Sequence, residues 1–595
     1  MVIVKKINVI LFIQACMFAF PLGGFAETWI ERSDQVAKEY SLDDADRYPE
    51  GASSLGYREY DSKATQLEDD METRDVASLE KWRAKLKKAI EAASDPNFKM
   101  DLNVLLESVE HGLEGKRLAE KYGDIPFYSA SKTVFNSLRE LINPQSGEDR
   151  KKAAVDRFKT YVNGHGNFKP LLEAYQSRVL YKESKHPKKQ LQSLRQEVEQ
   201  YLEESPDYVK GIQSLLEQSG RKDWSSDFEK FKGQVGRYDA FVRSHVLPKA
   251  RTDYRLPAEF YAYILKVRGI KATPDELIRL SLADYKTTYD RFKTVAKEVA
   301  KKHKLKESNP ASVINFLKSK QVTKTDEVKQ LYQNADTFLA KLIQKQGLVS
   351  LPKEPLKIRF ADEAESKANP VPHLVPPPLV GNRGERPEFV VPTAGSGKLP
   401  FDDFSYEAAA LILTAHEGRP GHDLQFSTML DNGVSVIRAR YAANNVNVEG
   451  WGLYAEDLVF HYLPLESQLA ALQTRLWRIA RGFLDPQIQL GKIEPKKVIQ
   501  VFTKELGVSD VMAGLEVRRY TYEDPGQAPS YYYGLKRIQV AKAALQKKLG
   551  ASFTDKCFND ALLSMGLLPI DLIAARLVES LQCPASTDLT NAGVL

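Results

Sequence analysis

Apolar residues recur every three or four positions over most of the first 350 residues, with lysine and glutamate between them. The segments 76–93 and 275–302 show this spacing clearly, and it is the period of an amphipathic α-helix. The pattern predicts helices from about residue 27 to residue 350.

The pattern changes over residues 367–400, which are rich in proline and glycine around a short β-like run, "EFVV". This composition predicts loops with one or two strands. Helical spacing returns at "SYEAAALILTAHE" and continues to about Leu581. We therefore expect a mostly α, multi-helical fold with a small β and loop element before the helix that ends in "HE".

Length and charge narrow the possibilities further. A chain of 595 residues is too long for one compact core, so we expect subdomains: residues 27–250, 251–366 and 367–595, the last carrying the catalytic region. The chain has 85 basic and 79 acidic residues, a net charge of +6. This excess is too dilute to indicate nucleic-acid binding. Oligomeric state cannot be predicted from the sequence.

The first 26 residues have the pattern of a secretory signal. Lys5 and Lys6 precede an apolar stretch, and small residues stand at the expected cleavage position. A lipoprotein anchor at Cys16 is the less favoured alternative. No later stretch is long and apolar enough to span a membrane. We expect an exported protein, periplasmic or secreted, in which Cys557 and Cys583 either form a disulfide or remain free thiols.

Candidate chemistry begins at "HEGRPGH", residues 416–422. Two histidines six positions apart lie roughly 240° apart on a regular helix and would face different directions. Pro420 and Gly421 interrupt the helix between them, so a break there would allow His416 and His422 to bind one metal.

A catalytic zinc site needs a third protein ligand. Glu449 and Glu456 stand seven positions apart in "VEGWGLYAED", hence on one face of a helix. Glu417 is the natural general base for a water that the metal activates. Two imidazoles and one carboxylate suit zinc, although manganese or cobalt could use the same ligands.

A third block, residues 516–550, concentrates arginine and tyrosine side chains before a helix that ends at Gly550. Such groups can stabilise a developing oxyanion or hold a substrate carboxylate. We expect four residues of this block to contact the substrate: Arg518, Tyr520, Tyr532 and Tyr533.

The blocks "HEGRPGHDLQ", "VEGWGLYAED" and "RYTYEDPGQAPSYYYG" together resemble a bacterial family known as domain of unknown function 885. The resemblance implies a metallopeptidase-like, mostly helical protein with one zinc per chain, bound by His416, His422 and Glu449. It also implies Glu417 as the base and Arg519 and Tyr531 as catalytic residues. From its spacing to Glu449, we expect Glu456 to support a ligand without binding the metal itself.

The combined expectation is an exported zinc-dependent peptidase that cleaves short peptides. The strand at "EFVV" could align an extended peptide by edge pairing. Two alternatives remain: a metallohydrolase that acts on a non-peptide amide or ester, and a catalytically silent periplasmic scaffold that binds peptides.

Overall fold

The computed structural model describes residues 27–69, 71–188, 190–361, 365–366, 369–378, 380–393 and 402–584. The predicted signal at 1–26, with Cys16, lies outside these residues. The fold is 70% helix and 3% strand, which confirms the prediction of a mostly α protein with a small β element.

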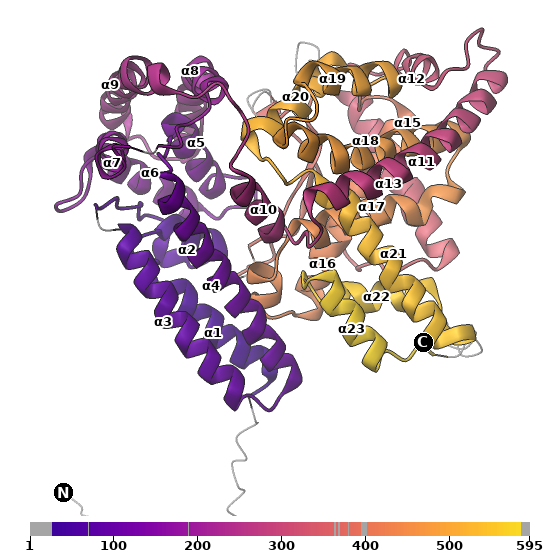
Figure 1. Ribbon diagram of the computed structural model, residues 1–595, viewed down its shortest axis with the longest axis horizontal. Helices are drawn as coiled ribbons and strands as arrows, with labels where there is room; N and C mark the ends of the chain where they lie inside the picture. Colours follow the sequence, from indigo (N-terminus) through magenta and orange to yellow (C-terminus); the bar gives the residue numbers. More distant parts are fainter. Residues whose placement is uncertain are drawn as a thin grey trace, which may run out of the picture.

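Within the described residues, the first part of the chain forms nine α-helices, drawn from indigo to purple in Figure 1. A separate apolar core formed by residues between 125 and 250 holds α5 to α9 together. The helices are α1 (Trp29–Asp43), α2 (Pro49–Leu55), α3 (Met71–Ala92), α4 (Pro96–Tyr122), α5 (Ala130–Leu141), α6 (Glu148–Asn163), α7 (Leu171–Lys185), α8 (Arg195–Gln218) and α9 (Ser225–Phe241).

The remaining helices share one large core that also takes in α1, α3 and α4. They are α10 (Ala258–Val267), α11 (Pro274–Lys302), α12 (Pro310–Lys318), α13 (Thr325–Gln346), α15 (Glu407–Glu417), α16 (His422–Asn432), α17 (Asn445–Val459), α18 (Leu465–Gln489), α19 (Pro495–Gln500), α20 (Asp510–Arg518), α21 (Pro529–Leu549), α22 (Asp555–Ser564) and α23 (Ile570–Ser580). Short turns of 3-10 or π-helix include η4 (Ile437–Tyr441) and η7 (Arg519–Glu523).

Two glycines let α17 and α21 touch backbone to backbone. A Cβ added at Gly450 would lie 2.7 Å from the Cα of Gly534, closer than real Cβ atoms come to other atoms. Because neither residue has a side chain, the helices cross at this point without a spacer. The crossing places the rest of α17 firmly between α15 and α21.

The β element is a three-stranded sheet with the order β1-β3-β2: β1 (Ile358–Phe360), β3 (Glu388–Val391), β2 (His373–Val375). β3 is the "EFVV" strand and is buried along its whole length. It pairs with β1 on one side and β2 on the other, so the expectation that it offers a free edge to a peptide is wrong. β2 is therefore an edge strand of the sheet, on the side away from β1.

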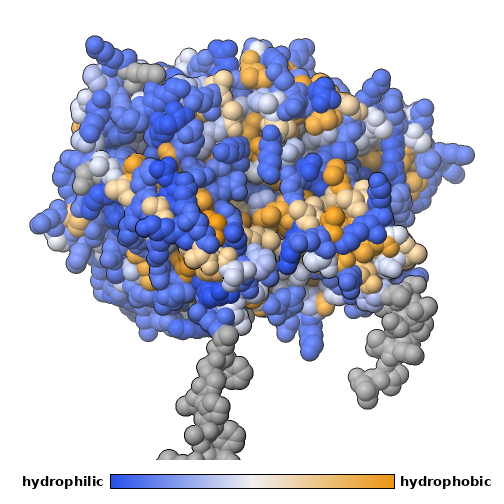
Figure 2. Space-filling view, turned by 60° about the horizontal axis from the view of Figure 1, so that its bottom comes forward, coloured by the Kyte–Doolittle hydropathy of each residue, from blue (hydrophilic) through white to orange (hydrophobic). Residues whose placement is uncertain are grey.

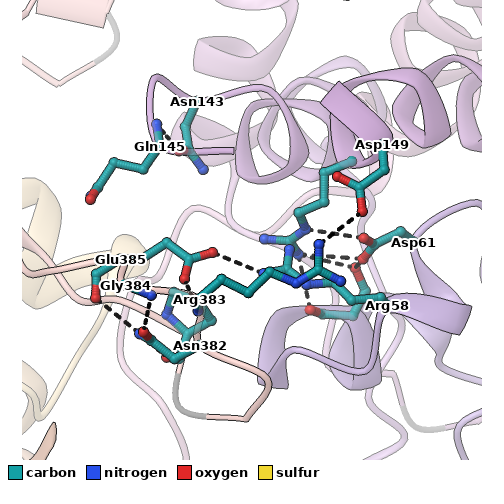
Figure 3. Close-up of polar contacts among 12 residues, drawn as sticks. Arg58, Asp61, Asn143, Gln145, Asp149, Asn382, Arg383, Gly384 and Glu385 are labelled. Atoms are coloured by element: carbon teal, nitrogen blue, oxygen red, sulfur yellow. Dashed lines mark hydrogen bonds and ion pairs between the residues drawn. The ribbon is translucent and has the colours of Figure 1, made fainter. Parts of the chain in front are cut away.

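The loop that follows β2 is fastened to the N-terminal helices (Figure 3). Arg58 donates to the carboxylate of Glu385 at 2.9 Å, and Arg383 pairs with Asp149 of α6 at 3.4 Å. Within the loop, the Asn382 side chain donates to the carbonyl of Glu385 at 2.9 Å. These contacts fix β2 between the two parts of the chain.

The C-terminal helices are joined by a disulfide between Cys557 and Cys583, which decides the open question in favour of pairing. Figure 2 shows apolar patches scattered over a mostly hydrophilic face. Among the described residues, no helix combines the length and the apolar character that a membrane span requires, as predicted for the mature chain.

Candidate metal centre

The chain breaks between the two histidines, as the spacing predicted. α15 ends at Glu417 and α16 begins at His422, so the imidazoles belong to different helices. The Arg419–Pro420 peptide within the break is cis. The two rings lie nearly perpendicular, with centroids 4.8 Å apart, and both are buried.

The break is held by a side chain from α17. The indole Nε1 of Trp451 donates to the carbonyl oxygens of Pro420 and Gly421 at 3.0 and 3.1 Å. Gly421 is required because a Cβ there would lie 1.8 Å from the carbonyl oxygen of His416. The tight return of the chain therefore depends on a missing side chain and on one indole donor.

Glu449 of α17 faces both imidazoles. Its Oε2 is 3.7 Å from Nε2 of His416 and 3.6 Å from Nε2 of His422. These distances are too long for hydrogen bonds. They match the separation of about 3.4 Å between two ligand atoms of a tetrahedral zinc ion. The other oxygen, Oε1, accepts a hydrogen bond from Gln527 at 3.3 Å. The donor set therefore suits zinc.

His416 is fixed from behind by a second buried glutamate. Its Nδ1 lies 2.8 Å from Oε1 of Glu456, whose Oε2 accepts a hydrogen bond from Thr474 at 3.0 Å. A carboxylate at Nδ1 leaves Nε2 as the lone-pair donor that a metal needs. The ring also lies directly over Gly452, where an added Cβ would come within 2.6 Å of it.

Glu417 offers a second way to complete a ligand triad. Its carboxylate and both imidazoles have ligand atoms within 4.8 Å of one another. However, Oε2 of Glu417 accepts the backbone N–H of Leu374 in β2 at 3.1 Å, and the side chain lines the cavity. Of the two carboxylates, Glu449 has one oxygen that faces both Nε2 atoms, which makes it the better candidate ligand, and Glu417 lies beside the cluster.

Carboxylates in the cluster outnumber the imidazoles that could carry a positive charge. Burial opposes charge on His416, but the nearby carboxylate of Glu449 and the hydrogen bond with Glu456 outweigh it and raise the pKa of the imidazole to about 9. Burial also opposes charge on Glu449, yet its contacts with both histidines lower the pKa of its carboxyl. A positive charge is favoured between these groups, and either a proton or a metal ion can supply it.

The cluster opens into a cavity of about 830 Å³. The cavity lies between the two parts of the chain: α8 contributes Gln200 and Glu204, and β2 contributes His373 and Leu374. Helices α15 to α18 and the η7 turn form the opposite wall. The N-terminal helices therefore contribute directly to the candidate site.

Some residues of the block rich in arginine and tyrosine line the cavity, and others lie in the core. Tyr531 lines the cavity, and its ring lies nearly parallel to that of His416 with centroids 6.2 Å apart. Burial raises the pKa of Tyr531 to about 12, so its phenol stays protonated and can donate a hydrogen bond. Arg518 and Arg519 also line the cavity.

Three of the predicted substrate contacts lie elsewhere. Tyr520 is fully buried and donates to Glu516 at 2.5 Å, while Tyr532 donates to Asp284 of α11 at 2.9 Å. Tyr533 packs against the main core. None of the three lines the cavity, because successive residues of a helix point about 100° apart.

Several cavity residues were not predicted from the sequence. His373 of β2 lies in a segment whose only visible signal was its proline content. Arg478 and Arg481 line the opposite wall, and "RLWRIAR" does carry a signal: arginines at every third position within an otherwise apolar helix. Glu516, which lines the cavity and pairs with Arg481, had no distinguishing pattern in the sequence.

Fold and site together define a class: a mostly helical protein with a buried histidine–carboxylate cluster beside an internal cavity. Residues 49–577 match a family described as "Bacterial protein of unknown function (DUF885)", and the chain belongs to that family. None of the curated proteins matches the chain.

Two solved structures share the fold. One is described as a candidate lipoprotein of unknown function from Shewanella oneidensis; it has 18% identity and a TM-score of 0.71, and covers 93% of this chain and 100% of its own. The other is a candidate lipoprotein from Colwellia psychrerythraea, with 15% identity and a TM-score of 0.72, covering 93% of this chain and 99% of its own. At these identities the likeness concerns the fold alone.

Proposed function

We propose that the protein is an exported zinc-dependent hydrolase that cleaves short peptides. The observation that carries the proposal is the convergence of three potential ligands, His416, His422 and Glu449, on one point at the wall of a cavity, with Glu417 beside them. A zinc ion in this place would polarise a substrate carbonyl and make water a better nucleophile at neutral pH.

The residues around the centre can manage the protons of such a reaction. Glu417 lies at the cavity wall, where its carboxylate can accept a proton from the attacking water and return it to the leaving amine. Tyr531 can donate a hydrogen bond to the developing oxyanion, since its phenol is protonated. The backbone of β2 runs beside Glu417 and offers an edge to an extended substrate.

Cavity size supports short substrates. A volume of about 830 Å³ falls within the range of about 300–1,000 Å³ that is typical of small-molecule sites. Walls from both parts of the chain line this partly open space, and the two histidines at its wall are buried, so a short extended peptide fits it better than the surface of a folded protein. Short peptides are therefore the favoured substrates.

Export is supported by two observations besides the predicted signal. The paired cysteines suit an oxidising compartment, and the two similar structures are described as candidate lipoproteins. We place the protein outside the cytoplasm on these grounds.

Metal content of the purified mature protein tests the centre. We expect about one zinc per chain, lost in His422→Ala and Glu449→Ala and retained in Glu466→Gln, a control at a half-exposed ion pair with Lys302. The variant Glu417→Gln should keep the metal and lose hydrolysis of a panel of short peptides. A native protein that binds no zinc would refute the proposal. Turnover of non-peptide amides or esters without peptide cleavage would show that these compounds, and not peptides, are the substrates.

A further inference from the structure

We propose that the cavity contains a carboxylate-binding subsite formed by Arg478 and Arg519. The substrates would then be short peptides that present a free carboxylate close to the scissile bond. That such a ligand is a substrate rests on the proposed function, whereas binding of a carboxylate at this place does not depend on hydrolysis.

Arg519 has no close carboxylate among the described residues, although Glu516 attracts it from beyond ion-pair distance. It begins η7, lines the cavity, and its Nη1 is buried without a hydrogen-bond partner. Within the described part of the chain its guanidinium makes no ion pair. The adjacent Arg518 differs, because it pairs with Glu523 at 2.7 Å and lies 3.8 Å from Glu204 of α8.

Arg478 of α18 is in the same situation. It is a buried residue that lines the cavity, and its Nε has no hydrogen-bond partner. Its only hydrogen bond among the described residues is a long one, 3.4 Å, to the backbone carbonyl of Thr474. No carboxylate in the described ranges lies within ion-pair distance of it.

The carboxylates nearby are already engaged. Glu516 receives two hydrogen bonds from Arg481, at 2.8 and 2.6 Å, and a third from Tyr520. Glu456 is held by His416 and Thr474. Three arginines therefore line this part of the cavity, Arg478 and Arg481 as buried residues and Arg519 with a buried Nη1, and among them only Arg481 has a carboxylate within ion-pair distance.

A buried charge without a partner is unfavourable, and the natural remedy is a ligand of opposite charge. Guanidinium donors suit a carboxylate, which they can bind through two parallel hydrogen bonds. The two arginines line the same cavity as Tyr531. Tyr531 in turn stacks on His416, so an anion held here lies next to the candidate centre.

Direct binding tests the subsite without requiring turnover. The probes are the tripeptide Ala-Ala-Ala and its C-terminal amide, titrated calorimetrically into the Glu417→Gln protein. We expect the free acid to bind at least about tenfold more tightly than the amide, since a charge-assisted bidentate pair is lost. In Arg519→Gln and in Arg478→Gln the preference should fall toward one. Arg537→Gln, which breaks a surface pair with Asp571, is the matched control and should keep it.

A second pair of probes identifies which carboxylate is recognised. Ala-Ala-Asp-amide against Ala-Ala-Asn-amide presents a side-chain carboxylate without a free C-terminus. A preference for the aspartate peptide assigns the subsite to acidic side chains, whereas a preference seen only with the free C-terminus assigns it to the chain end. Equal binding of acid and amide in both pairs, or no saturable binding of either acid at millimolar concentration, would overturn the proposal.

Thermal stability distinguishes a ligand site from a structural role. Because neither guanidinium has an ion pair, we expect Arg519→Lys and Arg519→Gln to melt at or above the midpoint of the parent protein. A midpoint several degrees lower would show that the arginine supports the fold and would count against the subsite. Zinc content of the same variants should not change, which separates this test from the test of the metal centre.

Discussion

Replacing Gly452 by alanine should damage the metal centre without touching a ligand. The added Cβ would lie 2.6 Å from Cε1 and 2.8 Å from Nε2 of His416. To reach an ordinary contact of 3.4 Å, the ring must retreat by about 0.8 Å. A shift of this size exceeds the tolerance of about 0.5 Å within which a binding site must be held.

The ring cannot retreat freely, because its Nδ1 is hydrogen-bonded to Glu456 at 2.8 Å. We therefore expect the Gly452→Ala protein to lose tenfold to a hundredfold in zinc affinity, about the effect of removing an outer hydrogen-bond partner of a ligand. Competition with a chromophoric chelator measures this affinity. Circular dichroism of the same sample shows whether the helices persist.

The chain offers a matched control at Gly514 of α20, where an added Cβ would meet nothing within 4 Å. Gly514→Ala should bind zinc as the parent does and gain about 0.5–1 kcal/mol in stability from the reduced freedom of the unfolded chain. A folded Gly452→Ala protein with parental zinc affinity would refute the reasoning, because it would mean that His416 is not a ligand in the observed orientation.

Three further predictions concern stability. Gly450→Ala should lower the free energy of unfolding by about 1–3 kcal/mol, since its Cβ meets the backbone of Gly534 and the helices must separate; a parental thermal midpoint would contradict this. Burial raises the pKa of Asp485 to about 8, above its unfolded value of about 4, so the stability due to its neutral form is complete below about pH 4 and is lost as pH rises through 8. In Asp485→Asn the thermal midpoint should vary less with pH between these limits than in the parent protein. An unchanged pH dependence would count against this prediction. Replacing both Cys557 and Cys583 by serine should cost about 3 kcal/mol in denaturant unfolding, given their separation of 26 residues, and no change in midpoint would exclude a stabilising role for the disulfide.

The helices could be predicted because their signal is local. Apolar spacing reports which face of each segment is buried, and α11 follows the predicted segment 275–302 almost residue for residue, as Pro274–Lys302. The sheet could not be predicted in the same way. "EFVV" does form a strand, but its central position depends on pairing with two three-residue strands that have no distinct pattern of their own.

The tyrosine triplet shows why site residues are harder to assign than helices. Tyr531, Tyr532 and Tyr533 are chemically identical neighbours, and only the direction of each on α21 decides its role. One faces the cavity, one bonds Asp284, and one packs into the core. A sequence gives the period of a helix but not the angle at which the helix is set against its neighbours.

The six-residue spacing of the histidines has a consequence for how the site is organised. Where two histidines stand four apart on one helix, the helix itself sets their geometry. Here the two histidines sit on separate helices, so their geometry must come from a third element. Helix α17 provides it: Trp451 holds the break, Gly452 makes room for His416, and Glu449 faces both rings. The same helix carries Glu456, which orients His416 from behind. Because α17 rests on α21 at Gly450, substitutions at that crossing should reach the centre through α17, although they touch no ligand.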